Sequence, residues 1–479
     1  MSKVAKGLAW SLSQNALSRL LSFAVFAVLG RLLGAEAFGL VALGQAILDV
    51  VVMWVDQGAV SYLVHKEELT DDHKNTAFWT SVGAASLLCA GLVTAAPLLA
   101  SAFDAPALTG VVRAMALVLP LAALSQVQTA LLTRSFDFRA LAIRQSVAAV
   151  LGGAAGIGAA FAGWGYYALV TQLLVAQTVS TAALWVASSW VPQFRWTRAI
   201  AVEQFRYGVG ITGANLVRIV GSRVDAFIIA AILGTSELGL YSVARRIMQL
   251  CSNILHKSAD AVILSSFSRQ QSDRNALEAA YHRALELSTA VSLPAFVGLA
   301  LVASDAVPLL LGAERWEAAV PVLQILCAAG VLLGPSYVNG SAFRAIGRPS
   351  RLLWIQLAQL TAYFIALALL YPLGLEGIAG AYVVALACQH PVEMWMMRAS
   401  GFAIRPWART AARLLFCTIL MGAAVVLVRY AATSLPFVWL RLALSSIAGI
   451  FTLLAALMIF APSLIRDARR QLRSMRERS

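Results

Sequence analysis

The side chains best able to do chemistry are charges that lie within long apolar stretches of the chain. An ionisable side chain at the depth of a bilayer costs roughly 2.5–3.5 kcal/mol on insertion scales, so such residues are usually functional. A desolvated arginine or lysine binds phosphate oxygens or another anionic group. Six cations of this kind are candidates for substrate binding: Arg19, Arg218, Arg223, Arg245, Arg246 and Lys257.

Four carboxylates share these apolar stretches with the cations. They are candidates for neutralising a neighbouring arginine or for carrying a coupling ion. The four are Asp49, Asp56, Asp225 and Asp260. A local i,i+3 pair between Lys257 and Asp260 is the plainer alternative for those two residues.

Plainer roles also stay open for some of the arginines. Arg223 and Asp225 are two residues apart and point to different sides of a helix, so they do not pair with each other and one of them would bridge to a neighbouring helix. Arg245 and Arg246 lie near the predicted outer end of a span, from which their long side chains would extend to the membrane surface.

No motif in the sequence would carry catalysis. It lacks the histidine pair of zinc proteases, a glycine-rich phosphate loop with its lysine, and a nucleophile elbow. Its five cysteines lie in apolar stretches without metal-ligand or disulfide spacing. A membrane polymerase or glycosyltransferase would use a large external loop, and none is predicted. We therefore expect a transporter with no catalytic site, metal or cofactor.

Long apolar runs must position these charges. The chain has 479 residues, of which 60% are hydrophobic and 13% charged, and its mean hydropathy is +0.77. A soluble domain contains far less apolar sequence. About 20 apolar residues cross the hydrocarbon core, and roughly fourteen runs approach that length. The sequence predicts an all-α integral membrane protein with about fourteen transmembrane helices.

The net charge of +14 reflects topology more than an affinity for nucleic acid, because the cations lie mostly in short loops between apolar runs. Basic loops alternate with a second set of five loops, in which Arg315 is the only cation. Since basic loops tend to stay in the cytoplasm, both termini are predicted to be cytoplasmic. The opposite loops are GAEAF (34–38), AGWG (162–165), GTSEL (234–238), GAERW (312–316) and PLGLEG (372–377).

A motif repeats at an offset of 200 residues. The pattern L-G-x-x-x-x-G-L occurs at 33–40 and again at 233–240. Both copies fall in loops of the same predicted side, which indicates a parallel repeat of two halves. Coincidence is the alternative, because glycine-bounded turns between membrane helices are common. We predict a six-helix bundle over 1–206, a second over 207–400, and an extra helix pair with a basic tail over 401–479.

Several stretches, in order over nearly the whole chain, carry a resemblance to a known family. They are GRLLGAEAFGLVALGQAILDVV (30–51), DQGAVSYLV (56–64), SFDFRALAIRQ (135–145), GWGYYALV (163–170), and LPAFVGLALVASDAVPLLLGAERWEAAVPVLQIL (293–326) with FRAIGRPSR (343–351). The chain resembles the Wzx-type lipid-linked oligosaccharide flippases, in the polysaccharide branch of the multidrug/oligosaccharidyl-lipid/polysaccharide (MOP) exporter superfamily.

The resemblance implies two six-helix bundles around a V-shaped cavity, with an extra C-terminal helix pair. It implies flipping of undecaprenyl-diphosphate-linked repeat units across the bacterial inner membrane by alternating access, for exopolysaccharide, capsule or O-antigen assembly. Either proton or sodium coupling is compatible with it, with Asp56 or Asp225 as coupling candidates. Partners would be the lipid-linked oligosaccharide, membrane lipids and other polysaccharide-assembly proteins, and no nucleic acid.

Two alternatives to this function stay open. The first is a multidrug or other lipid-linked-precursor exporter of the same superfamily, although an acidic interior is expected there and this chain has an excess of internal arginine. The second belongs to another class, a membrane scaffold that holds a polysaccharide-assembly complex through its basic loops. A translocation assay would separate the scaffold from a flippase.

Overall fold

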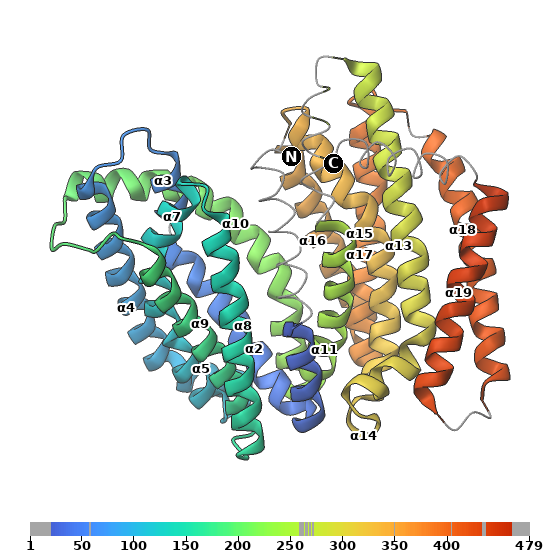
Figure 1. The fold of residues 1–479 in the computed structure, drawn as a ribbon, viewed down its shortest axis with the longest axis horizontal. Helices are drawn as coiled ribbons and strands as arrows, with labels where there is room; N and C mark the ends of the chain where they lie inside the picture. Colours follow the sequence, from blue (N-terminus) through green and yellow to red (C-terminus); the bar gives the residue numbers. More distant parts are fainter. Residues whose placement is uncertain are drawn as a thin grey trace. The chain divides into compact units, whose positions relative to one another are not determined.

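The computed structural model describes residues 21–461 apart from 57–58, 349, 404, 434–436 and most of 258–272; within this range the side chains of residues 56, 209–220, 257, 314, 405 and 406 lie outside the description. The chain divides into two compact units, residues 1–242 and residues 243–479 (Figure 1). The three-part division at residues 206 and 400 stays a prediction.

Unit 1 is built from helices that pack on their neighbours in sequence. The helix Leu21–Leu32 comes first. Helices α8 and α9 pack along their lengths, and α4 packs on α5 and α6. The helices are α2 (Ala35–Asp56), α3 (Ala59–His65), α4 (Asp71–Ala102), α5 (Leu108–Ala116), α6 (Val118–Ala123), α7 (Gln126–Arg134), α8 (Phe138–Phe161), α9 (Tyr167–Ala187), α10 (Arg198–Ile232) and the first part of α11 (Thr235–Ser252).

Unit 2 is organised around α13, which packs against α15 and α18. Helix α17 lies between α15 and α16, and α18 and α19 form a hairpin beside α13 (Figure 1). After the end of α11 the elements are η1 (Asn253–Lys257), α13 (Arg274–Leu311), α14 (Ala313–Trp316), α15 (Ala319–Ala345), α16 (Ser350–Leu370), η2 (Tyr371–Leu373), α17 (Gly374–Arg398), α18 (Arg405–Ala431) and α19 (Val438–Phe460).

The all-helical prediction is confirmed for the part of the chain that the structure describes. There, nine helical stretches are long and apolar enough to cross a membrane, or ten if the bent pair Leu108–Ala123 and Gln126–Arg134 is one span. One of the nine, Ser350–Arg398, contains both α16 and α17. The count of fourteen spans stays a prediction.

The five short glycine-containing loops that were predicted opposite the basic ones are all tight connections between helices. In the α10–α11 connection, Leu233 and Gly234 both donate to the carbonyl of Ile229, at 2.8 and 3.1 Å. Gly234 has φ +89°, in the left-handed region where a side chain is disfavoured. The glycine lets the chain reverse without leaving the carbonyls at the end of α10 unsatisfied.

The first turns of α2 and α11 pack backbone to backbone. A β-carbon on Gly39 would overlap the carbonyl of Thr235, and one on Gly239 would overlap the carbonyl of Ala35. Membrane helices associate largely through such close packing, because lipid tails are as apolar as the side chains they replace. Gly39 and Gly239, the second glycines of the two copies of the motif, therefore permit the close crossing of α2 and α11.

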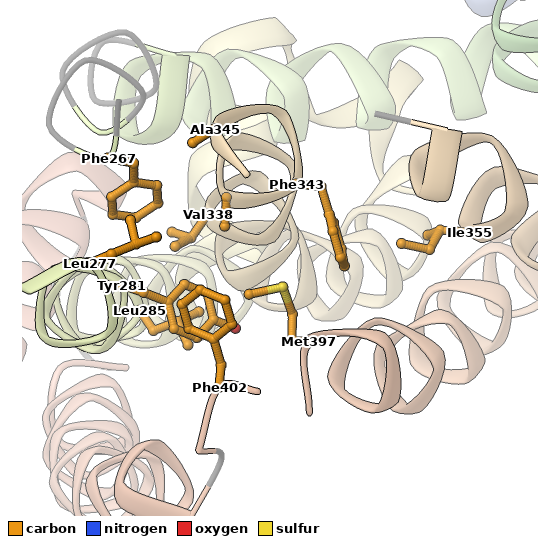
Figure 2. Packing of buried hydrophobic residues seen from close by; sticks show 11 residues of the cluster. Phe267, Leu277, Tyr281, Leu285, Val338, Phe343, Ala345, Ile355, Met397 and Phe402 are labelled. Carbon is orange, nitrogen blue, oxygen red and sulfur yellow. The ribbon is translucent and has the colours of Figure 1, made fainter. Parts of the chain in front are cut away.

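The buried aromatic core of unit 2 gathers at one end of α13, α15 and α17. Tyr281 and Leu285 from α13 pack with Val338 and Phe343 from α15 and with Met397 from α17 (Figure 2). All five are buried. Close packing here means that a shift of one helix end displaces side chains of the other two.

The close crossing of α2 and α11 predicts that a larger side chain at Gly39 destabilises the fold. Gly39→Val should lower the free energy of unfolding by about 1–3 kcal/mol, the usual cost of overpacking, because the backbone carbonyl of Thr235 cannot move aside. Thermal unfolding of the detergent-solubilised protein measures the loss. The matched control is Gly83→Val in α4, where nothing lies within 4 Å of the added β-carbon. Equal midpoints for the two variants would contradict the close crossing.

Candidate functional site

Arg223 on α10 forms an ion pair with Asp49 on α2. Arg223 Nη2 lies 2.5 Å from Asp49 Oδ2, and Gln45 Nε2 donates to Asp49 Oδ1 at 2.7 Å. The side chains are 39% and 26% exposed, so neither is sealed from its surroundings. Two of the predicted site residues, one cation and one carboxylate, are thus brought together in unit 1. Arg223 bridges to a neighbouring helix, which was the plainer alternative left open for Arg223 or Asp225.

Asp225 lies apart from this pair and is 3% exposed. Its Oδ2 accepts a hydrogen bond from the hydroxyl of Tyr241 on α11 at 2.7 Å, and its Oδ1 accepts from the backbone amide of Ala226 at 2.9 Å. These donors compensate part of the cost of burying the carboxylate. Asp225 ties α10 to α11 next to the close crossing of α11 with α2.

The predicted cations Arg245 and Arg246 belong to unit 2. The Arg245 guanidinium lies over the ring of Tyr382 on α17, with Cζ 5.4 Å from the ring centroid. A cation over a desolvated aromatic face is stabilised by the ring quadrupole. Arg246 is the more accessible of the two. Adjacent arginines therefore face different surroundings.

Five predicted site residues cannot be placed by their side chains. Arg218, Asp56 and Lys257 lie in α10, α2 and η1, but their side chains are outside the described part of the structure. Arg19 and Asp260 are wholly outside the described residues. Their roles stay predictions.

A buried carboxylate that sequence reasoning missed anchors the last helix pair. Asp305 on α13 is 1% exposed and pairs with two arginines, Arg429 from the last turn of α18 and Arg441 from the first turn of α19. Arg429 Nε lies 2.9 Å from Asp305 Oδ2, and its Nη2 donates to Ser304 Oγ at 3.1 Å. The charge within the apolar run ALVASDAVPLLL was the available signal.

A second missed carboxylate, Glu393 on α17, is 3% exposed. It accepts hydrogen bonds from Asn339 and Ser336 on α15 and lies beside His390. Its signal was a glutamate one turn after a histidine inside a predicted span. Unit 2 thus contains two buried carboxylates with different partners.

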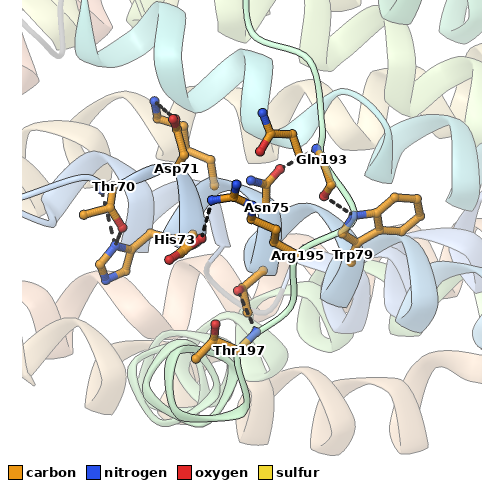
Figure 3. A network of polar contacts seen from close by, with 11 residues as sticks. Thr70, Asp71, His73, Asn75, Trp79, Gln193, Arg195 and Thr197 are labelled. Atoms are coloured by element: carbon orange, nitrogen blue, oxygen red, sulfur yellow. Dashed lines mark hydrogen bonds and ion pairs between the residues drawn. The ribbon is translucent and has the colours of Figure 1, made fainter.

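Hydrogen bonds hold the segment between α9 and α10 against the start of α4 (Figure 3). The amide of Gln193 donates to Asn75 Oδ1 at 2.7 Å, and the amide of Thr197 donates to Thr76 Oγ1 at 3.1 Å. Trp79 Nε1 donates to the Gln193 carbonyl at 2.9 Å. Because Asn75 and Thr76 are fully buried, these bonds fix where α10 begins.

A nearby ion pair, Lys66 with Glu203, joins the loop after α3 to α10 at a distance of 2.5 Å. The hydrogen bond between them raises the pKa of the Lys66 ammonium and lowers the pKa of the Glu203 carboxyl. Both groups face solvent, so the pair adds little stability and salt weakens it. It lies outside the apolar spans and has no place in the candidate substrate site.

Together these contacts give unit 1 a guanidinium and a carboxylate within apolar helices, a combination suited to an anionic substrate. Among the described residues, no group of three or more His, Cys, Asp or Glu could hold a metal ion.

Comparison with known families decides which class of membrane protein this is. A family profile for "Polysaccharide biosynthesis protein" matches residues 28–321, well over half of the chain. The chain belongs to this polysaccharide biosynthesis protein family. The resemblance inferred from the quoted stretches is confirmed.

Two curated relatives cover most of the chain. The succinoglycan biosynthesis transport protein ExoT of Rhizobium meliloti is 26% identical over 359 residues, which are 75% of this chain and 72% of that protein. The lipopolysaccharide biosynthesis protein WzxC of Escherichia coli is 22% identical over 72% of this chain and 70% of its own length. Both are proteins of polysaccharide assembly by name.

Solved structures with the same fold are membrane transporters. The lipid II flippase MurJ in an inward closed conformation matches with a TM-score of 0.79 at 14% identity, over 95% of this chain and 100% of that one. An inward-facing multidrug resistance MATE transporter of the MOP superfamily matches with a TM-score of 0.62 at 18% identity, over 82% of this chain and 98% of that one. At these identities the likeness shows the fold.

The Asp305 cluster predicts a large effect on stability. Asp305→Ala removes the partner of two largely buried arginines, so the free energy of unfolding should fall by about 3 kcal/mol. Thermal unfolding in detergent would show the loss, whereas Glu317→Ala, an exposed carboxylate, should change little. Asp305→Leu combined with Arg429→Met and Arg441→Met should recover most of it. Wild-type stability of Asp305→Ala would rule the anchor out.

The Lys66–Glu203 pair predicts a pH profile. The lowered pKa of Glu203 contributes stability above the ordinary value of 4.5, which is lost as the pH falls through the lowered value. The raised pKa of Lys66 contributes stability below 10.5, which is lost as the pH rises through the raised value. The melting temperature of wild type should exceed that of Glu203→Gln slightly between these limits, and less so in high salt. A difference that is the same at every pH would contradict the pairing.

Proposed function

We propose that this protein is a flippase that moves undecaprenyl-diphosphate-linked oligosaccharide units across the bacterial inner membrane, for exopolysaccharide, capsule or O-antigen assembly. The observation that carries the proposal is the family match over residues 28–321. Similarity to a succinoglycan transport protein and to a lipopolysaccharide biosynthesis protein supports a lipid-linked sugar as the cargo.

The charges inside the apolar helices support an anionic cargo. A diphosphate carries charge that must find donors wherever water is excluded, and a guanidinium supplies several in a fixed plane. In unit 1 the candidates are Arg223 and, five residues before it, Arg218, and in unit 2 a separate candidate is Arg245. The lipid tail needs no such site, because it stays in the bilayer.

The finer architecture is part of the same proposal. Fourteen spans would form two six-helix halves and a C-terminal pair, with both termini in the cytoplasm and alternating access by movement of the halves. The reciprocal crossing of Gly39 and Gly239, which are equivalent positions of the repeated motif, supports the parallel repeat. Basic loops on one side would face the cytoplasm and any partner enzymes of polysaccharide assembly.

Reconstitution tests the activity directly. The purified chain would be placed in liposomes containing undecaprenyl diphosphate linked to a fluorescent oligosaccharide, and a membrane-impermeant quencher would report the fraction facing out. A flippase should raise quenching above the half that faces out initially. Unchanged quenching would contradict the flippase proposal and favour the scaffold, and export of a cationic dye instead would favour a multidrug exporter.

The arginines make the sharpest mutational prediction in this assay. Arg223→Ala and Arg218→Ala should each slow translocation by about tenfold or more, because a hydrogen bond to a charged group contributes about 1.5–3 kcal/mol. Arg113→Ala, which removes an exposed arginine of α5, is the matched control. If both single variants and the double variant translocated normally at normal protein level, an anion-binding role for these arginines would be wrong.

A further inference from the structure

The polar cluster around Glu393 is the most completely built buried site in unit 2. Glu393 Oε2 accepts from Asn339 Nδ2 at 2.7 Å and from Ser336 Oγ at 3.1 Å. Gln389 Nε2 donates to the other carboxylate oxygen, Oε1. His390 Nδ1 lies 3.3 Å from Oε2. The glutamate therefore meets neutral donors and one imidazole.

The charge balance of this cluster depends on a proton. Among the described residues, no lysine or arginine is paired with Glu393, unlike Asp49 or Asp305. With His390 neutral the pair carries one negative charge, and with one added proton it carries none. An uncompensated charge away from water is costly, and a bound proton would compensate this one.

Among the described residues, the neighbouring elements pair no lysine or arginine with Glu393. From α13, the Tyr281 hydroxyl donates to Asn339, and from α15 the groups that contact Glu393 are Asn339 and Ser336. Two arginines of the helices packed against α17 donate to other groups. Arg351 on α16 donates to the Met396 carbonyl and to Ser400, and Arg344 on α15 donates to Ser341.

The ligand that fits this cluster is a proton, and a metal cation fits it poorly. Both oxygens of the carboxylate already accept hydrogen bonds, and an imidazole nitrogen stands where a cation would approach. His390 Nε2 and Gln389 Oε1 are buried without a hydrogen-bond partner in the described structure. Buried atoms of this kind require an explanation. A nitrogen that gains and loses a proton when the cluster opens to water provides one.

The cluster also joins the helix ends that form the aromatic core of Figure 2. Tyr281, which packs in that core, donates its hydroxyl proton to Asn339 Oδ1 at 2.8 Å, and Asn339 in turn donates to Glu393. Three helices, α13, α15 and α17, are therefore linked through one hydrogen-bonded chain. A change of charge at Glu393 alters the bonds that hold these ends together.

We propose that Glu393 and His390 form a proton-binding site, whose occupancy controls the packing of α13, α15 and α17 at their shared end. The proton comes from the aqueous phase, neutralises the pair, and returns to water when the helix ends separate. Its coupling to translocation rests on the proposed flippase function, whereas the site itself does not.

Infrared titration of the purified full-length protein tests the site without any cargo. A buried coupled pair should give one protonation transition that disappears in both Glu393→Gln and His390→Gln. Glu376→Gln, an exposed glutamate of the same helix, should leave that transition in place. A transition that persists in both pair variants would overturn the proposal. If Glu393→Gln fails to fold, Glu393→Asp takes its place and should keep a protonation transition. The double variant Glu393→Asp with His390→Gln should lose that transition. A transition that persists in the double variant would also overturn the proposal.

The liposome assay with the fluorescent undecaprenyl-diphosphate oligosaccharide tests the coupling. The wild-type rate should vary with pH by up to about tenfold per unit on one side of the transition, as for one titrating group, and Glu393→Gln should flatten this profile. An identical pH profile in wild type and Glu393→Gln would refute the coupling. Absence of translocation by wild type, with the infrared transition present, would refute the flippase function and leave the proton site standing.

Discussion

Charge that lies within an apolar helix must be compensated, and this constraint determines much of how the chain packs. An unpaired ion in such surroundings is destabilising by more than most single contacts stabilise. The partly exposed Asp49 and the described buried carboxylates Asp225, Asp305 and Glu393 are therefore each found with donors directed at them. Asp49 has an arginine, Asp305 has two, Asp225 has a tyrosine, and Glu393 has amides, a hydroxyl and a histidine. Each carboxylate has at least one partner on another helix. Compensation of charge therefore also specifies which helices are neighbours.

The choice of partner has consequences for function. An arginine stays charged at any physiological pH, so Asp305 with Arg429 and Arg441 is a permanent anchor for α18 and α19. Glu393 has no such cation among its described partners, so the charge of its cluster depends on the proposed proton. The helices that carry this cluster are the ones whose ends share the aromatic core. Unit 2 thus contains one carboxylate with permanently charged partners, Asp305, and one whose proposed partner is a proton, Glu393.

Local features of the sequence predicted the all-helical character of the described chain, whereas the count of fourteen spans stays a prediction. Apolar runs predicted helices, and glycine-containing loops predicted turns, because each depends on residues close together in the chain. The candidate site was predicted only by residue type. A bridge from Arg223 or Asp225 to another helix was one of the alternatives left open, but the partner Asp49 lies far away in sequence, and nothing local specifies that pairing. Glu393 was missed for a related reason: one carboxylate near a span end resembles an interfacial residue until packing shows that α13 and α15 cover it.

The pairing of Arg223 with Asp49 also limits how an anionic cargo could bind. A diphosphate that reaches Arg223 must compete with a carboxylate already 2.5 Å away, so part of the attraction is spent in separating the pair. Gln45 still donates to Asp49 after the exchange, but an amide cannot replace a cation. Binding would therefore leave Asp49 undercompensated and favour its neutralisation or a movement of α2 relative to α10. Such an exchange weakens cargo binding, which suits a transporter because the cargo must also be released on the far side.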